Sequence, residues 1–288
     1  MGQARLQSAG SERRVVATIR GRAASDGAGV KLTRIIGQPG LPDLDPFLML
    51  DEFGSDRGAD YIAGFPDHPH RGFETVTYML AGRMRHGDNQ GNVGLLRPGS
   101  VQWMTAGRGI IHSEMPEQED GLMQGFQLWV NLPAKDKMVK PRYQDIDPEN
   151  IPVVERADGV TVKVLVGSFD GVTGPVTNVA TDPLYLDITL PAGRTAIVPV
   201  EAEHNAFAYV FEGQARIGAE AQMVERGQLA VLSLGESAAF EGGPAGGRLI
   251  LVAGRPLREP VAKYGPFVMN TPEEIRQAIA DYQAGRFV

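Results

Sequence analysis

The sequence of 288 residues predicts an all-β protein of two tandem β-barrel domains with one short α-helix near the C-terminus. Three observations support this fold class. Apolar segments are short and are separated by turns, for which 36 glycines and 20 prolines are available. The two halves repeat the same order of strands and glycine turns, and one segment near the C-terminus carries clear helix-start signals. The length also fits two domains of roughly 150 residues each.

Segments rich in β-branched, aromatic and aliphatic residues recur through the first half and read as strands. They are residues 15–19, 47–50, 73–80, 101–104 and 126–130. Residues 73–80 end at the turn Ala81-Gly82. This regular spacing of short strands favours a barrel or sandwich over alternating strands and helices.

Residues 134–152 are polar and proline-rich, so we expect an exposed connector there. The predicted domains are residues 14–133 and 153–288, on either side of it, and the first ten residues are expected to be disordered. The strands expected in the second half are residues 160–166, 184–190, 197–200, 206–211, 229–234 and 248–252.

The halves resemble each other at a period of about 130 residues, which is too long for a solenoid repeat. Residues 74–82 align with residues 205–213, and both segments end in a glycine turn. A second turn, at residues 97–101, falls near residues 226–229. The sequence therefore predicts a duplicated β domain.

The single helix is predicted from Thr271 onward. Thr271 suits the N-cap, Pro272 suits the first helical position, and Glu274 stands three residues after the cap. Gly285 offers a stop. The apolar stripe expected to pack on a barrel wall consists of Ile275, Ile279 and Tyr282.

Composition excludes several classes of function. The chain has no cysteine, which excludes disulfides, thiol nucleophiles and cysteine-based zinc sites. Its net charge of -7 and the lack of a basic cluster argue against a nucleic-acid partner. No apolar run is long enough to span a membrane, and the N-terminal region lacks the apolar core of a signal peptide. We therefore expect a cytoplasmic protein without a membrane partner.

Two short motifs carry the candidate chemistry. His68 and His70 are two residues apart, as are His112 and Glu114. In a strand, residues at this spacing point to the same face, so each pair projects together into a barrel. Three imidazoles and one carboxylate suit Fe(II), Mn(II), Ni(II), Cu(II) or Zn(II) and disfavour calcium and magnesium.

Alternatives to this ligand set remain at the level of the residues. A His-x-His pair on a strand is more often a polar pair on the surface, or a hydrogen-bonded pair in a core, than part of a metal site. Glu74 lies on the same strand face as His70 and is the alternative carboxylate ligand. His86 precedes a turn-rich stretch and is expected at a solvated rim, and His204 is expected to be structural. The positions of the second half that align with His68 and His70 are Pro199 and Glu201, so that half lacks a full ligand set.

Longer strings around these motifs resemble one family. Residues 65–76, which run Phe-Pro-Asp-His-Pro-His-Arg-Gly-Phe-Glu-Thr-Val, and residues 102–115, which contain Gly-Ile-Ile-His-Ser-Glu, are similar to pirins. Residues 128–132 and 265–271 add to the resemblance, which covers nearly the whole chain from about residue 15 to 287. Pirins are bicupins, and the resemblance therefore implies two tandem cupin barrels of the double-stranded β-helix type.

The resemblance also implies site residues and a cofactor. By the pirin pattern, His68, His70, His112 and Glu114 hold one divalent metal, most commonly Fe(II), and Glu74 supports them without binding the metal. Glu114 would also act catalytically by accepting the proton of a substrate hydroxyl.

Two functions follow from this resemblance. The first is that of a quercetin 2,3-dioxygenase, an oxidoreductase that cleaves a flavonol with O2 and releases carbon monoxide. The alternative is a metal-dependent regulatory or redox-sensing protein that binds a protein partner. Apolar residues at the cavity mouth would suit a flat aromatic substrate, and Met49, Phe53 and Trp103 are the candidates.

Overall fold

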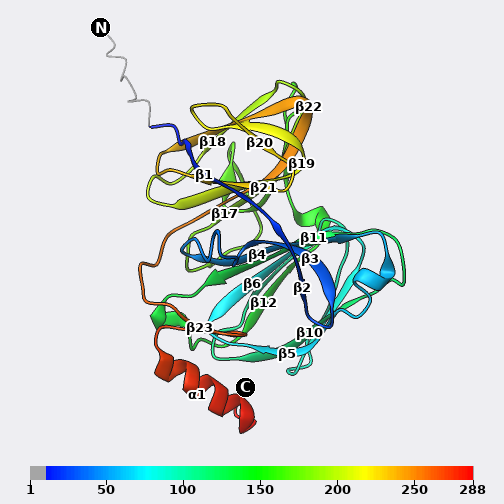
Figure 1. The fold of residues 1–288 in the computed structure, drawn as a ribbon, viewed down its shortest axis with the longest axis vertical. Coiled ribbons are helices and arrows are strands. Elements are labelled where there is room, and N and C mark those ends of the chain that lie inside the picture. The colour runs from blue at the N-terminus through cyan, green and yellow to red at the C-terminus, as the bar shows by residue number, and fades with distance from the viewer. Residues whose placement is uncertain (1–10, 288) are drawn as a thin grey trace.

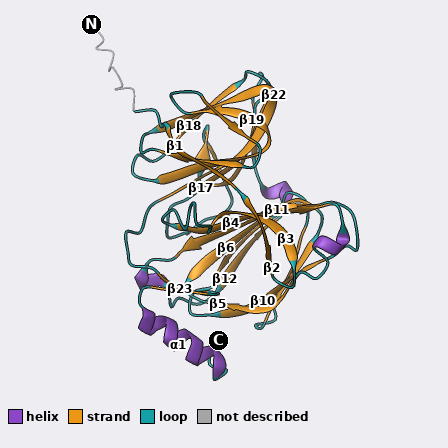
Figure 2. Ribbon diagram, viewed as in Figure 1, coloured by secondary structure: helices purple, strands orange, loops and turns teal. Residues whose placement is uncertain are grey.

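The structure is a computed structural model and describes residues 11–287. Two β-rich units are stacked along the long axis of the molecule, and a single α-helix lies at the far end of the first unit (Figures 1 and 2). The predicted all-β class with two tandem barrels and a C-terminal helix is confirmed. The disorder expected for the first ten residues concerns a segment outside the described ones.

The first unit consists of a seven-stranded antiparallel sheet, in the order β12-β9-β6-β11-β4-β3-β2, and a four-stranded sheet, in the order β5-β10-β7-β8. Its strands are β2 (Arg22–Asp26), β3 (Val30–Ile36), β4 (Phe47–Ser55), β5 (Phe65–His70), β6 (Phe73–Ala81), β7 (Met84–Asp88), β8 (Val93–Leu96), β9 (Val101–Thr105), β10 (Ile110–Pro116), β11 (Met123–Asn131) and β12 (Arg142–Ile146).

The second unit is built on one nine-stranded antiparallel sheet, with the main order β1-β21-β19-β22-β17-β14-β13. Its strands are β1 (Val15–Arg20), β13 (Val153–Glu155), β14 (Thr161–Val166), β17 (Leu184–Leu190), β18 (Thr195–Pro199), β19 (Asn205–Ile217), β20 (Gln222–Glu225), β21 (Gln228–Leu232) and β22 (Ser237–Gly254). The remaining elements are the pairs β15 (Ser168–Phe169) with β16 (Val172–Thr173) and β23 (Ala262–Tyr264) with β24 (Phe267–Met269), the 3-10 helices η1 (Gly58–Asp60), η2 (Ala134–Asp136) and η3 (Pro148–Asn150), and α1 (Pro272–Gln283).

The two large sheets have the same strand order. The central strand β6 lies between β9 and β11, and the central strand β19 lies between β21 and β22. These are the segments that align in the sequence, because residues 74–81 fall on β6, with Gly82 directly after it, and residues 205–213 fall on β19. The duplication seen in the sequence therefore corresponds to a repeated strand order.

The edge strands of the two sheets come from unexpected parts of the chain. β1 pairs with β21 of the second unit, although it precedes the first unit in sequence (Figure 1). β12, within the connector at residues 134–152, pairs with β9 of the first unit. The apolar pattern of β1 indicated a strand without its partner, and the polar composition of the connector did not indicate the pairing of β12. The domain boundaries at residues 133 and 153 stay a prediction.

The central strands of the large sheets are buried on both faces. β6 is buried over its first seven residues, and it crosses the middle of the large sheet. One hydrophobic cluster spans the contact between the units, with Phe47, Phe126 and Trp103 from the first and Phe207 and Tyr209 from the second. The units therefore share a core.

The C-terminal segment returns from the second unit to the first and ends in α1 (Figure 1). Thr271 and Glu274 form the expected capping box, and Pro272 opens the helix. Ile275 is buried in a cluster formed mainly by the C-terminal segment, to which Ile111 of β10 contributes from the first unit, so the helix packs largely on β23 and β24 and not directly on the barrel wall. Tyr282 is 41% exposed and meets the ring of Phe267 edge-on. Among the described residues, no helix is long and apolar enough to cross a membrane.

Candidate metal centre

Three imidazoles converge on one face of the four-stranded sheet. β5 carries His68 and His70, and the neighbouring strand β10 places His112 directly opposite His68. The ring centroids lie 4.7 Å apart for His68 and His70, 4.4 Å for His68 and His112, and 5.0 Å for His70 and His112. One nitrogen from each ring lies within 4.8 Å of the others, which is a spacing at which a metal ion can be held. The structure thus brings together the three histidines that the sequence singled out.

The protonation of these rings suits metal binding. His68 Nδ1 lies 2.8 Å from the carbonyl oxygen of Pro66. A carbonyl can only accept, so Nδ1 is the donor of this hydrogen bond and Nε2 is the nitrogen left to bind a metal. Burial lowers the pKa of His70 and of His112 well below 6.5, and neighbouring histidine charges act in the same direction. These two rings are therefore neutral at pH 7, as a metal ligand must be.

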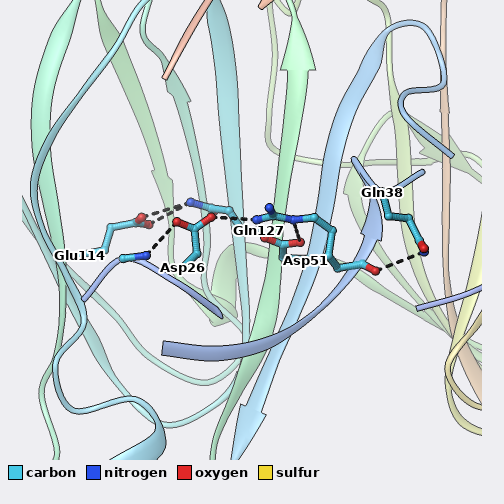
Figure 3. Close-up of polar contacts among 7 residues, drawn as sticks. Asp26, Gln38, Asp51, Glu114 and Gln127 are labelled. Carbon is cyan, nitrogen blue, oxygen red and sulfur yellow. Dashed lines mark hydrogen bonds and ion pairs between the residues drawn. The ribbon is translucent and has the colours of Figure 1, made fainter. Parts of the chain in front are cut away.

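Glu114 follows His112 on β10 after a bulge in the pairing with β5, and it lines the same cavity as His68 and His70. Its carboxylate accepts a hydrogen bond of 3.1 Å from Gln127 Nε2 (Figure 3). Thr77 Oγ1 lies 3.0 Å from Glu114 Oε1 and 2.6 Å from Gln127 Oε1, and its single proton serves one of them at a time. Glu114 is held near the three imidazoles, but it is not one of the residues whose ligand atoms lie within 4.8 Å of one another.

Glu74, the alternative carboxylate, lies elsewhere. It is buried on β6, its Oε1 accepts a hydrogen bond of 2.6 Å from Thr105 on β9, and it does not line the cavity. Burial raises the pKa of Glu74, which opposes the charged form that a metal ligand needs.

The cavity beside the histidines has a volume of about 630 Å³, within the range of small-molecule sites. Its walls are largely apolar, with Met49, Phe53, Phe65 and Trp129 among the lining residues. Met49 and Phe53 were expected there, but Trp103 was not correctly placed. Trp103 is 1% exposed and belongs to the core shared by the two units, because the alternation along β9 turns it to that side of the sheet.

His86 was predicted at a solvated rim, and this prediction is wrong. It is 1% exposed on β7, opposite Glu114 of β10, and its ring centroid lies 5.8 Å from that of His112. The turn indicated by the neighbouring glycine and asparagine residues comes later, at residues 89–92, so β7 runs on past His86 into the sheet. His204 is also buried, in the second unit, where its backbone oxygen accepts a hydrogen bond from Arg13.

Sequence reasoning missed a row of polar side chains that crosses the large sheet at one level. Strand register places them side by side on successive strands. This polar row consists of Arg34, Asp51, Gln127, Thr77, Gln102 and Asp145. A local signal existed, because Asp51 shares a strand face with the apolar residues Met49 and Phe53.

The donor set fits a transition metal. Both ring nitrogens of His112 and Nδ1 of His70 are buried, and no described group hydrogen-bonds to them. Buried polar atoms are normally satisfied, and a metal bound through one nitrogen of each ring would satisfy part of this unpaired set. Imidazole nitrogen with one nearby carboxylate suits iron, manganese, nickel, copper or zinc.

Two family models match the chain. The model described as Pirin matches residues 29–130, and the model described as Pirin C-terminal cupin domain matches residues 185–288. The first match contains the histidine motifs, and the second covers the unit in which they are absent.

Individual proteins agree with these matches. A Pseudomonas aeruginosa protein is 52% identical over 92% of this chain and 94% of its own. Its name gives it a provisional assignment as a quercetin 2,3-dioxygenase. Human pirin is 46% identical over 95% of this chain and 93% of its own. A crystal structure of quercetin 2,3-dioxygenase from Acinetobacter baumannii matches with a TM-score of 0.88 and 31% identity, over 96% of this chain and 99% of that one.

Proposed function

The chain belongs to the pirin family of bicupins, and from this premise we propose that it is a metal-dependent dioxygenase that cleaves a flavonol such as quercetin with O2 and releases carbon monoxide. The observation that carries the proposal is a three-histidine cluster of which His68 and His70, together with Glu114, line a cavity of about 630 Å³. Two relatives named for this activity support the choice of substrate class.

The proposed ligands of the metal are His68, His70, His112 and Glu114, with Fe(II) as the favoured ion. A divalent metal at this position supplies a Lewis acid that lowers the pKa of a coordinated hydroxyl, together with redox chemistry towards O2. Three neutral imidazoles and one carboxylate would leave one formal positive charge, which favours an anionic oxygen of the substrate. A nickel complex is known for a distant pirin of Escherichia coli, at 19% identity and a TM-score of 0.64, so the choice among ions remains part of the proposal.

The cavity walls bind and orient the substrate. Trp129 packs against Phe73 with ring centroids 4.4 Å apart, which fixes one aromatic face beside His70. Met49 and Phe53 offer apolar surface from β4. A flat aromatic guest gains from stacking and apolar burial on such walls, and the walls exclude water from the reacting face.

Glu114 is the proposed acceptor of the substrate hydroxyl proton. Gln127 and Thr77 hold its carboxylate in place, so it needs little reorganisation when the proton arrives. A carboxylate at this position can bind the metal or accept the proton, and the hydrogen bonds from β6 and β11 determine where it rests. The side chain is catalytic in this proposal because it faces the reacting oxygen.

Oxygen consumption tests the proposal. Protein reconstituted with Fe(II) is mixed with quercetin in air-saturated buffer, and oxygen uptake and carbon monoxide are measured together. We expect both in the natural protein and neither in His70→Ala, with His204→Ala, a buried histidine of the second unit, as the matched control. Circular dichroism checks the fold of both variants. If fully metallated natural protein consumes no oxygen with any of a panel of flavonols, the dioxygenase proposal fails and the metal-dependent regulatory function becomes the better account.

A further inference from the structure

A second polar group lines the cavity, on the wall formed by β3 and β4. Arg34 donates two hydrogen bonds to Asp51, of 3.0 Å from Nε and 2.7 Å from Nη2. Its Nη2 also donates to Asp26, at 2.8 Å, from the neighbouring strand β2. All three side chains line the same cavity as His68 and His70. We call these three residues the distal triad.

The distal triad lies on the seven-stranded sheet, whereas the proposed metal ligands lie on the four-stranded sheet. Arg34 pairs with Asp51 in the strand register, and Asp51 pairs with Gln127, which holds Glu114 (Figure 3). Adjacent strands are about 4.8 Å apart, so β3 lies roughly 10 Å from β11. Arg34, His68 and His70 line one cavity, so a guest with one end at the histidines that extends through the cavity towards β3 would bring its other end to Arg34.

The triad has free donor capacity. A guanidinium carries five N–H donors, and the three hydrogen bonds to Asp51 and Asp26 use Nε and Nη2. Among the described residues, no oxygen accepts a hydrogen bond from Nη1. The Arg34 side chain is 25% exposed and the Asp26 side chain 50%, whereas Asp51 is 3% exposed. A donor on Arg34 and an acceptor on Asp26 are therefore open to a guest, and Asp51 serves to fix Arg34.

The triad carries a net negative charge. The hydrogen bonds of Asp51 raise the pKa of Arg34 above its ordinary value, so the guanidinium stays charged. Burial raises the pKa of Asp51, and the hydrogen bonds from Arg34 oppose that rise, as expected for a bidentate ion pair. One positive and two negative charges leave one negative charge at this end of the cavity. A guest carboxylate would meet that charge, whereas a neutral hydroxyl can donate to Asp26 and accept from Arg34.

We propose that the distal triad selects the substrate at its end remote from the metal, by accepting an aromatic hydroxyl and rejecting a carboxylate. This inference rests on the proposed function for the orientation of the guest, with its metal-binding oxygen at the histidines. It names Arg34 and Asp26 as specificity-determining residues, and it defines the substrate class as hydroxylated aromatic compounds without an acidic group at the distal end.

A purely structural role for the triad makes a different prediction. If Arg34 only joined β3 to β4, its replacement would alter stability and leave the ranking of guests unchanged. Arg34→Lys separates the two roles. Lysine keeps the charge and has three donors, which Asp51 and Asp26 take up, so no donor remains for the guest. Asp26→Asn removes the surplus negative charge at a half-exposed position without leaving a buried group unpaired.

The test measures binding without turnover. Zinc-substituted protein is titrated anaerobically, by calorimetry, with quercetin, with 3-hydroxyflavone and with a 3-hydroxyflavone that carries a carboxylate on its pendant ring. 3-Hydroxyflavone keeps the metal-binding oxygens and lacks every distal hydroxyl. Two hydrogen bonds to the triad should make quercetin bind about tenfold more tightly than 3-hydroxyflavone. The carboxylated compound should bind more weakly than either.

The two variants should each change the affinity for a different compound. Arg34→Lys should reduce the quercetin preference to about threefold or less, and Asp26→Asn should improve binding of the carboxylated compound by about fivefold. The matched controls are Lys31→Arg, on the same strand outside the cavity, and Asp56→Asn, an exposed acidic residue after β4, and both should leave all ratios unchanged. Unchanged ratios in Arg34→Lys and Asp26→Asn overturn this inference alone. If none of the three compounds binds, both this inference and the proposed substrate class are overturned. If the compounds bind and the variants change the affinity ratios as expected, but the iron-loaded protein consumes no oxygen, this inference is upheld and the dioxygenase activity is contradicted.

Discussion

Buried imidazole nitrogens without partners dominate the energetics of the site. Each unsatisfied buried polar group costs about 1 to 3 kcal/mol, and His112 has two such nitrogens. Neutral rings reduce this cost compared with charged ones, and burial keeps the pKa of His112 well below its ordinary value. A metal bound through one nitrogen of each ring would relieve part of this cost in the folded state only, so metal binding should also stabilise the fold.

The two candidate carboxylates are separable by mutation. Glu114 faces the cavity and Glu74 is turned towards Thr105 on the adjacent strand. We expect Glu114→Gln to lower metal affinity more than about 100-fold and Glu74→Gln less than about tenfold, because loss of a direct ligand exceeds the usual effect of a supporting group. Competition with a chromophoric chelator measures both affinities. The opposite order would identify Glu74 as the ligand.

At the scale of elements, hydrogen bonds from Lys137 connect η2 and β24 to the turn that follows the histidine strand β5. Lys137, at the end of η2, is 1% exposed and donates from Nζ to the carbonyl oxygens of Gly72 at 2.8 Å and Val268 at 3.0 Å, and to Asn131 Oδ1 at 2.8 Å. Burial lowers the pKa of Lys137 to about 8, so it is still largely charged at pH 7. One side chain thus joins the connector, the turn after His70 and β24.

Replacement of Lys137 should reveal this junction. Lys137→Met leaves three buried acceptors without their donor, and we expect a loss of about 2 to 4 kcal/mol in the free energy of unfolding. Lys135→Met, an exposed position on the same 3-10 helix, is the matched control and should change stability by less than about 0.5 kcal/mol. Urea unfolding measures both. Equal midpoints for the two variants would mean that the three hydrogen bonds contribute little.

At the scale of the whole molecule, two sheets of the same strand order have different interiors. The first barrel contains the cavity lined by His68 and His70. The interior of the second barrel is filled by aliphatic residues such as Val164, Leu186, Val198 and Leu251. A close-packed apolar interior leaves no ligands and no room for an ion. The chemistry therefore resides in one half of a duplicated fold, and the other half serves as a packed support.

This asymmetry predicts one metal ion per chain. Protein reconstituted with Fe(II) and freed of excess ion should contain about one equivalent by elemental analysis, and His70→Ala should contain much less. Since His204 lies in the second barrel, His204→Ala should retain the full equivalent. Two equivalents in the natural protein, or loss of metal in His204→Ala, would place an ion outside the three-histidine cluster.

Much of this protein was predictable from short stretches of sequence, because the rules involved are local. Residues two apart on a strand share a face, and this spacing alone put His68 beside His70 and His112 beside Glu114. The helix start at Thr271 follows from a capping pattern of four residues. Alternation and turn residues indicated the strands and their duplicated order.

Tertiary structure alone decided which strands became neighbours. Strand pairing joins residues far apart in the chain, so no local pattern could place Arg34 beside Asp51, or Gln127 beside Glu114. The same reason applies to β1, which pairs with the second sheet although the polar and apolar pattern of residues 15–20 fits either sheet equally well. The sequence determined the class of fold and indicated the candidate ligands, and the register of distant strands determined the second set of polar residues that lines the cavity.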